Sequence, residues 1–290
     1  MWVIKQHLAW DFMNLAKPKD IIVIYHADCI DGFGAAWSAF KKFGSQSRYV
    51  PARFGEPFPK HNANCEVYIL DFSYSPEIIL TVAKTLKRLT LIDHHITAMK
   101  QFENVVMPEN VAVHFDMNHS GCLLAWSYFF PQLDAPMILR HIEDRDLWRF
   151  ELKGTQEITT AIYEQMPISF RAFGALRLNQ LFSVGKIQVA QMTKMVKRLV
   201  KNAHPIKIGD TTGLAVNACA FFASELGHVL AEQSGGVGMI YYYDGGKKQW
   251  NFGLRSIGNL DVGELAVEYG GGGHVNAAGF SLSHNPFLPI

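Results

Sequence analysis

Three short apolar runs, each followed by aspartate or histidine side chains, constrain the fold of this chain more than any other feature. They lie at residues 21–25, 67–70 and 89–92. The segments between them predict helices at 33–43 and from Pro76 onward, where proline suits the first helical position. Apolar strands that alternate with helices are typical of βαβ units and a parallel sheet. We therefore expect an α/β fold whose N-terminal domain holds a mostly parallel sheet flanked by helices.

The pattern changes after residue 205, where strand-like and helical stretches follow one another at short spacing. The strand-like stretches are 213–218, 237–243 and 249–256, and the helical ones are 224–233 and 261–269, with Asp261 as N-cap. Residues 154–205 are predicted to be mostly helical, with a long helix at 186–202. We expect an N-terminal domain at 1–185, a connector helix at 186–205 and a smaller α+β domain at 206–290.

Acidic and histidine side chains follow all three predicted strands. In chain order they are His26 and Asp31, then Asp71, then Asp93, His94 and His95. The C-terminal ends of parallel strands meet at one edge of a sheet, where ligands bind. Several carboxylates at one point repel each other unless a cation neutralises them, and Asp and His are ligands for Mn²⁺, Mg²⁺, Zn²⁺ or Fe²⁺. We predict two divalent ions bridged by Asp71, an arrangement suited to phosphoryl displacement.

Charge and apolar patterning limit the partners. The 290 residues carry 27 Lys+Arg against 26 Asp+Glu, a formal net charge of +1, which argues against a long nucleic-acid track. No run reaches the roughly 18 apolar residues of a membrane-spanning helix. Near the N-terminus Lys5, His7 and Asp11 interrupt the apolar residues, unlike a signal peptide. We expect a soluble, cytoplasmic protein whose cysteines are free thiols.

The ordered set of motifs resembles the DHH/DHHA1 phosphoesterase family. It comprises HADCIDG at 26–32, the Asp-His-His triplet at 93–95, and GGGH followed by AAGF at 271–280. The triplet alone is a weak signal, but the ordered set is specific and covers most of the chain. The family includes nanoRNases, cyclic-dinucleotide phosphodiesterases, RecJ-type exonucleases and, through the DHH half, manganese pyrophosphatases and exopolyphosphatases. The resemblance implies a DHH catalytic domain and a DHHA1 substrate-binding domain.

The resemblance also implies roles for individual residues. The implied metal ligands are His26, Asp31, Asp71, His94 and Asp146. The implied catalytic residues are Asp71 as bridging ligand, His95 as a contact to the scissile phosphate, and Asp93, which orients a histidine from behind. Asp146, four residues before Phe150, matches the family's Asp-x-x-x-Phe motif, and Asp144 is its rival.

The first motif departs from the family pattern. The family has two aspartates separated by one residue, whereas here Cys29 stands two positions before Asp31 and the acidic residue is Asp28. Three alternatives follow: Asp28 reaches a metal, Cys29 does, or one ion has fewer protein ligands. A thiolate would favour a softer ion than Mg²⁺.

The glycine-rich motif suggests a phosphate site of its own. Gly271, Gly272 and Gly273 let the backbone approach a ligand closely, and successive N–H groups form an anion nest. His274 adds a hydrogen-bond donor. Arg255, in a Leu-Arg-Ser sequence similar to a family element, suits bidentate phosphate binding. By resemblance, these residues hold the end of the substrate away from the metals.

The function implied by the resemblance is a metal-dependent phosphodiesterase. It would hydrolyse short oligonucleotides or linear or cyclic dinucleotides by metal-activated hydroxide, with two ions, Mn²⁺ ahead of Mg²⁺. Two alternatives are a phosphoanhydride hydrolase acting on pyrophosphate or polyphosphate, and a non-catalytic nucleotide-binding relative. We expect no long-duplex binding and no membrane partner, and a homodimer is compatible with this interpretation.

Overall fold

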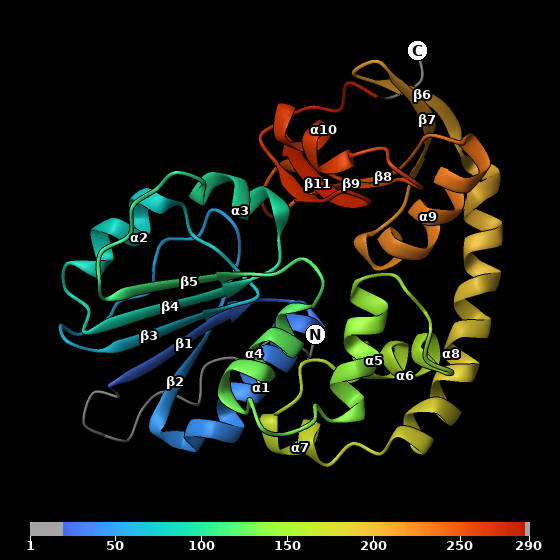
Figure 1. Ribbon diagram of the computed structural model, residues 1–290. Coiled ribbons are helices and arrows are strands. Elements are labelled where there is room, and N and C mark those ends of the chain that lie inside the picture. Colours follow the sequence, from blue (N-terminus) through green and yellow to red (C-terminus); the bar gives the residue numbers. More distant parts are fainter. Residues whose placement is uncertain (1–19, 288–290) are drawn as a thin grey trace, which may run out of the picture.

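The computed structural model describes residues 20–287 as two lobes, each built on its own β-sheet (Figure 1). The segment at 1–19, on which the prediction about a signal peptide rests, and residues 288–290 lie outside the described residues. A single long helix, α8 (Leu178–Leu199), runs along one side of the molecule and joins the lobes (Figure 1). The predicted α/β class is confirmed.

The first sheet is entirely parallel and has the strand order β2-β1-β3-β4-β5. Its strands are β1 (Ile21–His26), β2 (Ser47–Ala52), β3 (Glu66–Leu70), β4 (Arg88–Asp93) and β5 (Val111–Phe115). The chain adds β2 on one side of β1 and then β3, β4 and β5 on the other side, so the order of the strands reverses between β1 and β3. In a parallel sheet this reversal opens a crevice at the C-terminal ends of the two strands, which is where the motif residues lie.

Helices cover both faces of this sheet, which explains why β1 and β3 are apolar at consecutive positions. One face carries α1 (Ile30–Phe43) and α4 (Gly121–Phe129), and the other carries α2 (Pro76–Ala83) and α3 (Ile96–Phe102) (Figure 1). Val23 of β1 belongs to the core on the α1 side, and its neighbour Ile24 belongs to the core on the α2 side.

The remaining helices of the first lobe are α5 (Met137–Asp146), α6 (Thr155–Tyr163) and α7 (Phe170–Gly174). Short 3-10 turns lie at Gly44–Gln46, Val200–Asn202 and Ala220–Phe222. Among residues 20–287, no helix is both long and apolar enough to cross a membrane.

The second lobe is a mixed six-stranded sheet in the order β10-β11-β9-β8-β7-β6. Its strands are β6 (His204–Ile208), β7 (Thr211–Asn217), β8 (Val237–Asp244), β9 (Gln249–Arg255), β10 (Gly272–His274) and β11 (Ala277–Leu282). Only β7 and β8 pair in parallel. Its helices are α9 (Ala223–Ser234) and α10 (Val262–Glu268), and the Asp261 side chain caps α10 as predicted.

The long helix begins earlier than the sequence predicted. The expected helix at 186–202 in fact begins at Leu178 and ends at Leu199, and a strand rather than a helix begins at His204. The buried face of α8 already includes Leu181 and Gly185, so the first two turns pack like the rest. The polar residues at 179 and 180 in the first turn interrupt the apolar periodicity, so the sequence pattern did not indicate the start of the helix.

Candidate metal centre and active site

Three carboxylates, two buried and one partly buried, converge on one histidine at the crevice of the first sheet. Asp31 lies in the first turn of α1, Asp71 directly follows β3, and Asp146 is the last residue of α5. The Nε2 atom of His94 lies 3.0 Å from Asp71 Oδ1, 3.7 Å from Asp31 Oδ2 and 3.6 Å from Asp146 Oδ2. The structure thus brings together four residues that are separated by up to 115 positions in the sequence.

The arrangement of these carboxylates suits a bound cation. The Oδ2 atoms of Asp31, Asp71 and Asp146 are all buried and have no hydrogen-bond partner among the described residues. Burial, reinforced by the charge of Asp71, raises the pKa of Asp31 well above its ordinary value and also raises the pKa of Asp146. Unpaired carboxylate oxygens are costly inside a protein, and a divalent ion would satisfy all three. The oxygen and nitrogen donors present fit such an ion.

Asp71 belongs to three of the four groups of possible metal ligands found among residues 20–287. Two of them are Asp31, Asp71 and His94, and His26, Cys29 and Asp71; within each, the ligand atoms lie within 4.8 Å of one another. The third joins Asp71 to the Asp93–His95 pair. His26 Nδ1 is 3.5 Å from Asp71 Oδ2. Burial favours the neutral form of Asp71, but the neighbouring His26 and His94 side chains lower its pKa below the ordinary value. This position between two groups is where a bridging ligand belongs.

The two alternative aspartates, Asp28 and Asp144, lie outside the cluster. The side chain of Asp28 is 71% exposed and accepts a hydrogen bond from Arg53 Nε at 2.7 Å. Asp144 is buried, but it accepts hydrogen bonds from the backbone N–H of residues 151 and 152, at 2.8 and 3.0 Å, and from the Thr155 hydroxyl. Asp144 therefore holds the loop that follows α5, whereas Asp146 lines the cleft.

His95 is held from behind by Asp93. Its Nδ1 lies 2.6 Å from Asp93 Oδ1, and Ser73 Oγ donates to Asp93 Oδ2 at 2.6 Å. Both groups are buried, and although burial alone lowers the pKa of His95, the charge of Asp93 raises it above its ordinary value. With Nδ1 engaged by Asp93, Nε2 is the ring nitrogen left for a ligand.

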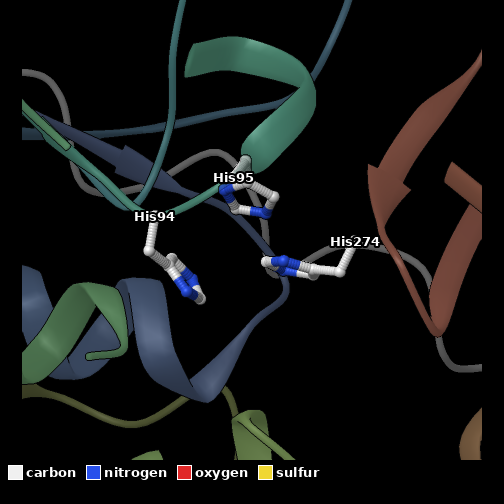
Figure 2. A group of neighbouring side chains, drawn as sticks. All are labelled: His94, His95 and His274. Atoms are coloured by element: carbon white, nitrogen blue, oxygen red, sulfur yellow. The ribbon is translucent and has the colours of Figure 1, made fainter. Parts of the chain in front are cut away.

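The second lobe supplies the opposite wall of the site. His274 of β10 points at the histidine pair, with its ring centroid 4.4 Å from that of His95 and 4.8 Å from that of His94 (Figure 2). Burial lowers the pKa of His274 well below its ordinary value, so its ring is neutral. The cleft between the lobes has a volume of about 280 Å³, and Arg255 also lines it.

The predicted glycine motif divides in two. Gly272 and Gly273 line the cleft, whereas Gly271 does not. A Cβ at Gly271 would lie 2.1 Å from the carbonyl oxygen of Gly279, so this glycine permits close packing against β11. Gly273 has a φ of +147°, a conformation that favours glycine.

The start of α4 supports the centre and was not predicted. Ser120 Oγ donates to Asp31 Oδ1 at 2.6 Å, and the backbone N–H of Cys122 donates to the same atom at 3.1 Å. A Cβ at Gly121 would lie 2.4 Å from Asp71 Cβ, so only glycine leaves room for that carboxylate. The one sequence signal at this position is the Ser-Gly pair at 120–121.

A family model and one known protein match this chain by sequence. Residues 211–287 match the DHHA1 domain model. The uncharacterized protein R106 of Acanthamoeba polyphaga mimivirus is 30% identical over 293 residues, which span 92% of this chain and 68% of the relative.

Among solved structures, the chain is similar to the pGpG-specific phosphodiesterase PggH from Vibrio cholerae. The TM-score is 0.44, with 12% identity over 90% of this chain and 92% of the other. It is also similar to Thermus thermophilus RecJ in complex with Mn²⁺, with a TM-score of 0.48 and 12% identity over 90% of this chain and 49% of RecJ. A third similar structure is an exopolyphosphatase-related protein from Bacteroides fragilis, with a TM-score of 0.40 and 14% identity over 91% of this chain and 87% of the other.

Proposed function

Because the chain belongs to the DHH/DHHA1 phosphoesterase superfamily, we propose that it is a metal-dependent phosphodiesterase that hydrolyses short oligonucleotides or linear or cyclic dinucleotides. One observation carries the proposal. Among the described residues, three clustered carboxylates each have a buried oxygen without a hydrogen-bond partner. Two of them, Asp71 and Asp146, line a cleft whose opposite wall is formed by His274 and Arg255 of the DHHA1 region. A cation site and a phosphate site thus share one cleft.

The proposed metal ligands are those implied by the sequence, with Mn²⁺ ahead of Mg²⁺ and two ions. They are His26, Asp31, Asp71, His94 and Asp146. When bound, such ions supply positive charge to the phosphoryl oxygens and acidify the attacking water. The protein contributes the geometry, because the Ser120 hydroxyl and the α4 amide hold Asp31 in place, and Gly121 leaves room for Asp71.

His95 is the proposed contact to the scissile phosphate. Asp93 engages Nδ1 and its charge raises the pKa of the ring, which favours a proton on Nε2 as well. That N–H is the proposed hydrogen-bond donor to a phosphoryl oxygen. That donor strengthens as negative charge develops on the oxygen in the transition state.

The second lobe is proposed to hold the distal part of the substrate. Arg255 is fixed by hydrogen bonds from Nη1 to the Leu254 carbonyl at 2.8 Å and from Nη2 to Ser224 Oγ at 3.0 Å. Arg255, Gly272, Gly273 and His274 then present donors to a phosphate. The net charge of +1 supports a short substrate held in one cleft.

The test is a substrate panel assayed with Mn²⁺ and with Mg²⁺. It contains a 5′-phosphorylated dinucleotide, a cyclic dinucleotide, a longer oligonucleotide, polyphosphate and pyrophosphate, with Asp71→Asn and His95→Ala as variants. We expect turnover of the short diesters and a fall on the order of a thousandfold in Asp71→Asn, the loss of several kcal/mol. Turnover of polyphosphate or pyrophosphate alone would favour a phosphoanhydride hydrolase. Nucleotide binding without any turnover would favour a non-catalytic module.

A further inference from the structure

We propose that Cys29 is a metal ligand, so that the two ions occupy unlike donor sets, one with sulfur and one without. This inference rests on the proposed function, because it concerns the ions on which that function depends. The Sγ atom of Cys29 and the ligand atoms of His26 and Asp71 lie within 4.8 Å of one another. The Oδ2 atom of Asp71, which is 3.5 Å from His26 Nδ1, is buried and accepts no hydrogen bond from any residue between 20 and 287.

The local backbone favours Cys29 over the neighbouring carboxylate. Asp28 has a φ of +58°, and its side chain turns outward to pair with Arg53. Cys29 is the extended N-cap residue of α1 and lines the cleft together with His26. Asp31, two residues later, belongs to the other ligand group, with Asp71 and His94. The first motif thus delivers one thiol and one carboxylate to two adjacent positions.

The two donor sets differ in chemical softness. His26, Cys29 and Asp71 offer nitrogen, sulfur and oxygen, a combination that selects Zn²⁺, Co²⁺ or Fe²⁺ over Mg²⁺. The second set is richer in carboxylate oxygen and consists of Asp31, Asp71, His94 and Asp146. Oxygen-rich sets suit Mn²⁺ and Mg²⁺. Formation of the metal–sulfur bond releases the thiol proton to solvent.

Cobalt substitution of the full chain tests this inference directly. We expect two equivalents of Co²⁺ to bind, and one of them to show the near-ultraviolet absorption of thiolate-to-cobalt charge transfer. Cys29→Ser should lose that band. Cys219→Ser is the matched control, since Cys219 is an exposed thiol in the second lobe, and it should keep the band. Cys29→Asp should bind two ions without the band.

Affinity and bond length give two further readouts. In Cys29→Ser the affinity for Cd²⁺ should fall at least about tenfold, because even the loss of a residue that only supports a metal ligand costs about that much. The affinity for Mn²⁺ should fall less, because Mn²⁺ prefers oxygen ligands. X-ray absorption of the Zn²⁺-loaded wild-type protein should contain one sulfur scatterer at roughly 2.3 Å. This last measurement needs no variant, so it shows whether any thiol binds the metal even if Cys29→Ser does not fold.

The outcomes separate this inference from the proposed function. Two bound Co²⁺ ions without a charge-transfer band, or no sulfur scatterer around Zn²⁺, would overturn the role of Cys29 and leave the phosphodiesterase intact. A band that persists in Cys29→Ser would also overturn it and assign the sulfur to another thiol, such as Cys122. Failure of the wild-type protein to bind any divalent ion or to turn over any diester would overturn the proposed function itself.

Discussion

At the scale of single residues, the centre depends on small side chains as much as on the ligands. Gly121 and Ser120 shape the positions of Asp71 and Asp31, yet neither carries a chemical group that a motif search would assign to catalysis. The candidate ligands could be proposed from the sequence because Asp and His side chains follow three successive predicted strands. The supporting residues were not, because their role follows from a distance that only the folded chain defines.

Gly121→Ala should displace Asp71 and weaken metal binding while the protein stays folded. The added Cβ would fall 2.4 Å from Asp71 Cβ, and such overpacking typically costs about 1–3 kcal/mol. We expect Mn²⁺ affinity to fall about tenfold or more by isothermal titration. Gly245→Ala is the control, because a Cβ there meets nothing within 4 Å. Equal Mn²⁺ affinities in the two variants would contradict this prediction.

Asp93→Asn should slow the chemical step and move the pH profile. The charge of Asp93 raises the pKa of His95, so its removal lowers that pKa and the ring loses its proton at a lower pH. We expect kcat to fall by up to about 100-fold, as for other groups that orient an active-site histidine, with KM nearly unchanged. The alkaline limb of the kcat–pH profile should shift toward lower pH. A limb that stays in place would mean that His95 does not act as a protonated donor.

At the scale of elements, the strands that the sequence identified were the inner ones. β1, β3 and β4 are covered on both faces and appear as apolar runs, whereas β2, β6 and β10 were missed and β5 was not predicted as a strand; all four are sheet edges. An edge strand needs no continuous apolar surface. β2 even contains Pro51, which an edge position tolerates because no neighbouring strand needs its N–H. β10 lies in the glycine run, where strand propensity is weakest.

The two aspartates of α5 should separate into a structural and a metal-binding residue. Asp144→Asn places an amide against the donors of the following loop and should lower stability by about 2–3 kcal/mol, as expected for hydrogen bonds to a charged acceptor. Asp146→Asn removes one of three clustered carboxylates and should leave the metal-free protein as stable or more so. Thermal unfolding with and without Mn²⁺ measures both effects.

In the same experiment Mn²⁺ at 100 times its Kd should stabilise the wild-type protein and Asp144→Asn by about 2.7 kcal/mol. The stabilisation should be largely lost in Asp146→Asn. If Asp144→Asn lost it instead, the assignment of the family's Asp-x-x-x-Phe motif to Asp146 would be wrong.

At the scale of the whole molecule, the cleft exists because two lobes are held face to face by contacts remote in sequence. Arg145 of α5 pairs with Glu225 of α9 at 2.5 Å, and Lys100 of α3 pairs with Glu264 of α10 at 2.9 Å. The Arg145–Glu225 pair is largely buried, and the Lys100–Glu264 pair is exposed. Exposed pairs contribute little, so the buried pair is the stronger link between the lobes.

Glu225→Gln should loosen the cleft and weaken substrate binding. It leaves Arg145 partly buried without its charged partner, and Arg145 Nη1 already has no hydrogen-bond partner among the described residues. We expect KM for a dinucleotide to rise several-fold with a smaller change in kcat, and the radius of gyration from small-angle scattering to increase. Glu264→Gln is the matched control at the exposed pair and should change neither quantity.

The long helix α8 connects the lobes and also packs into the hydrophobic core of each one. Leu181 belongs to the core of the first lobe, whereas Met192 and Val196 belong to the core of the second. At the 1.5 Å rise of an α-helix, Leu181 and Val196 are about 22 Å apart, so a bend of roughly 10° between them would displace the far anchor by about 4 Å. That displacement is comparable with the 4.4 Å between the rings of His95 and His274. The spacing of the two cleft walls is therefore sensitive to the straightness of α8, in addition to the ion pairs that link the lobes.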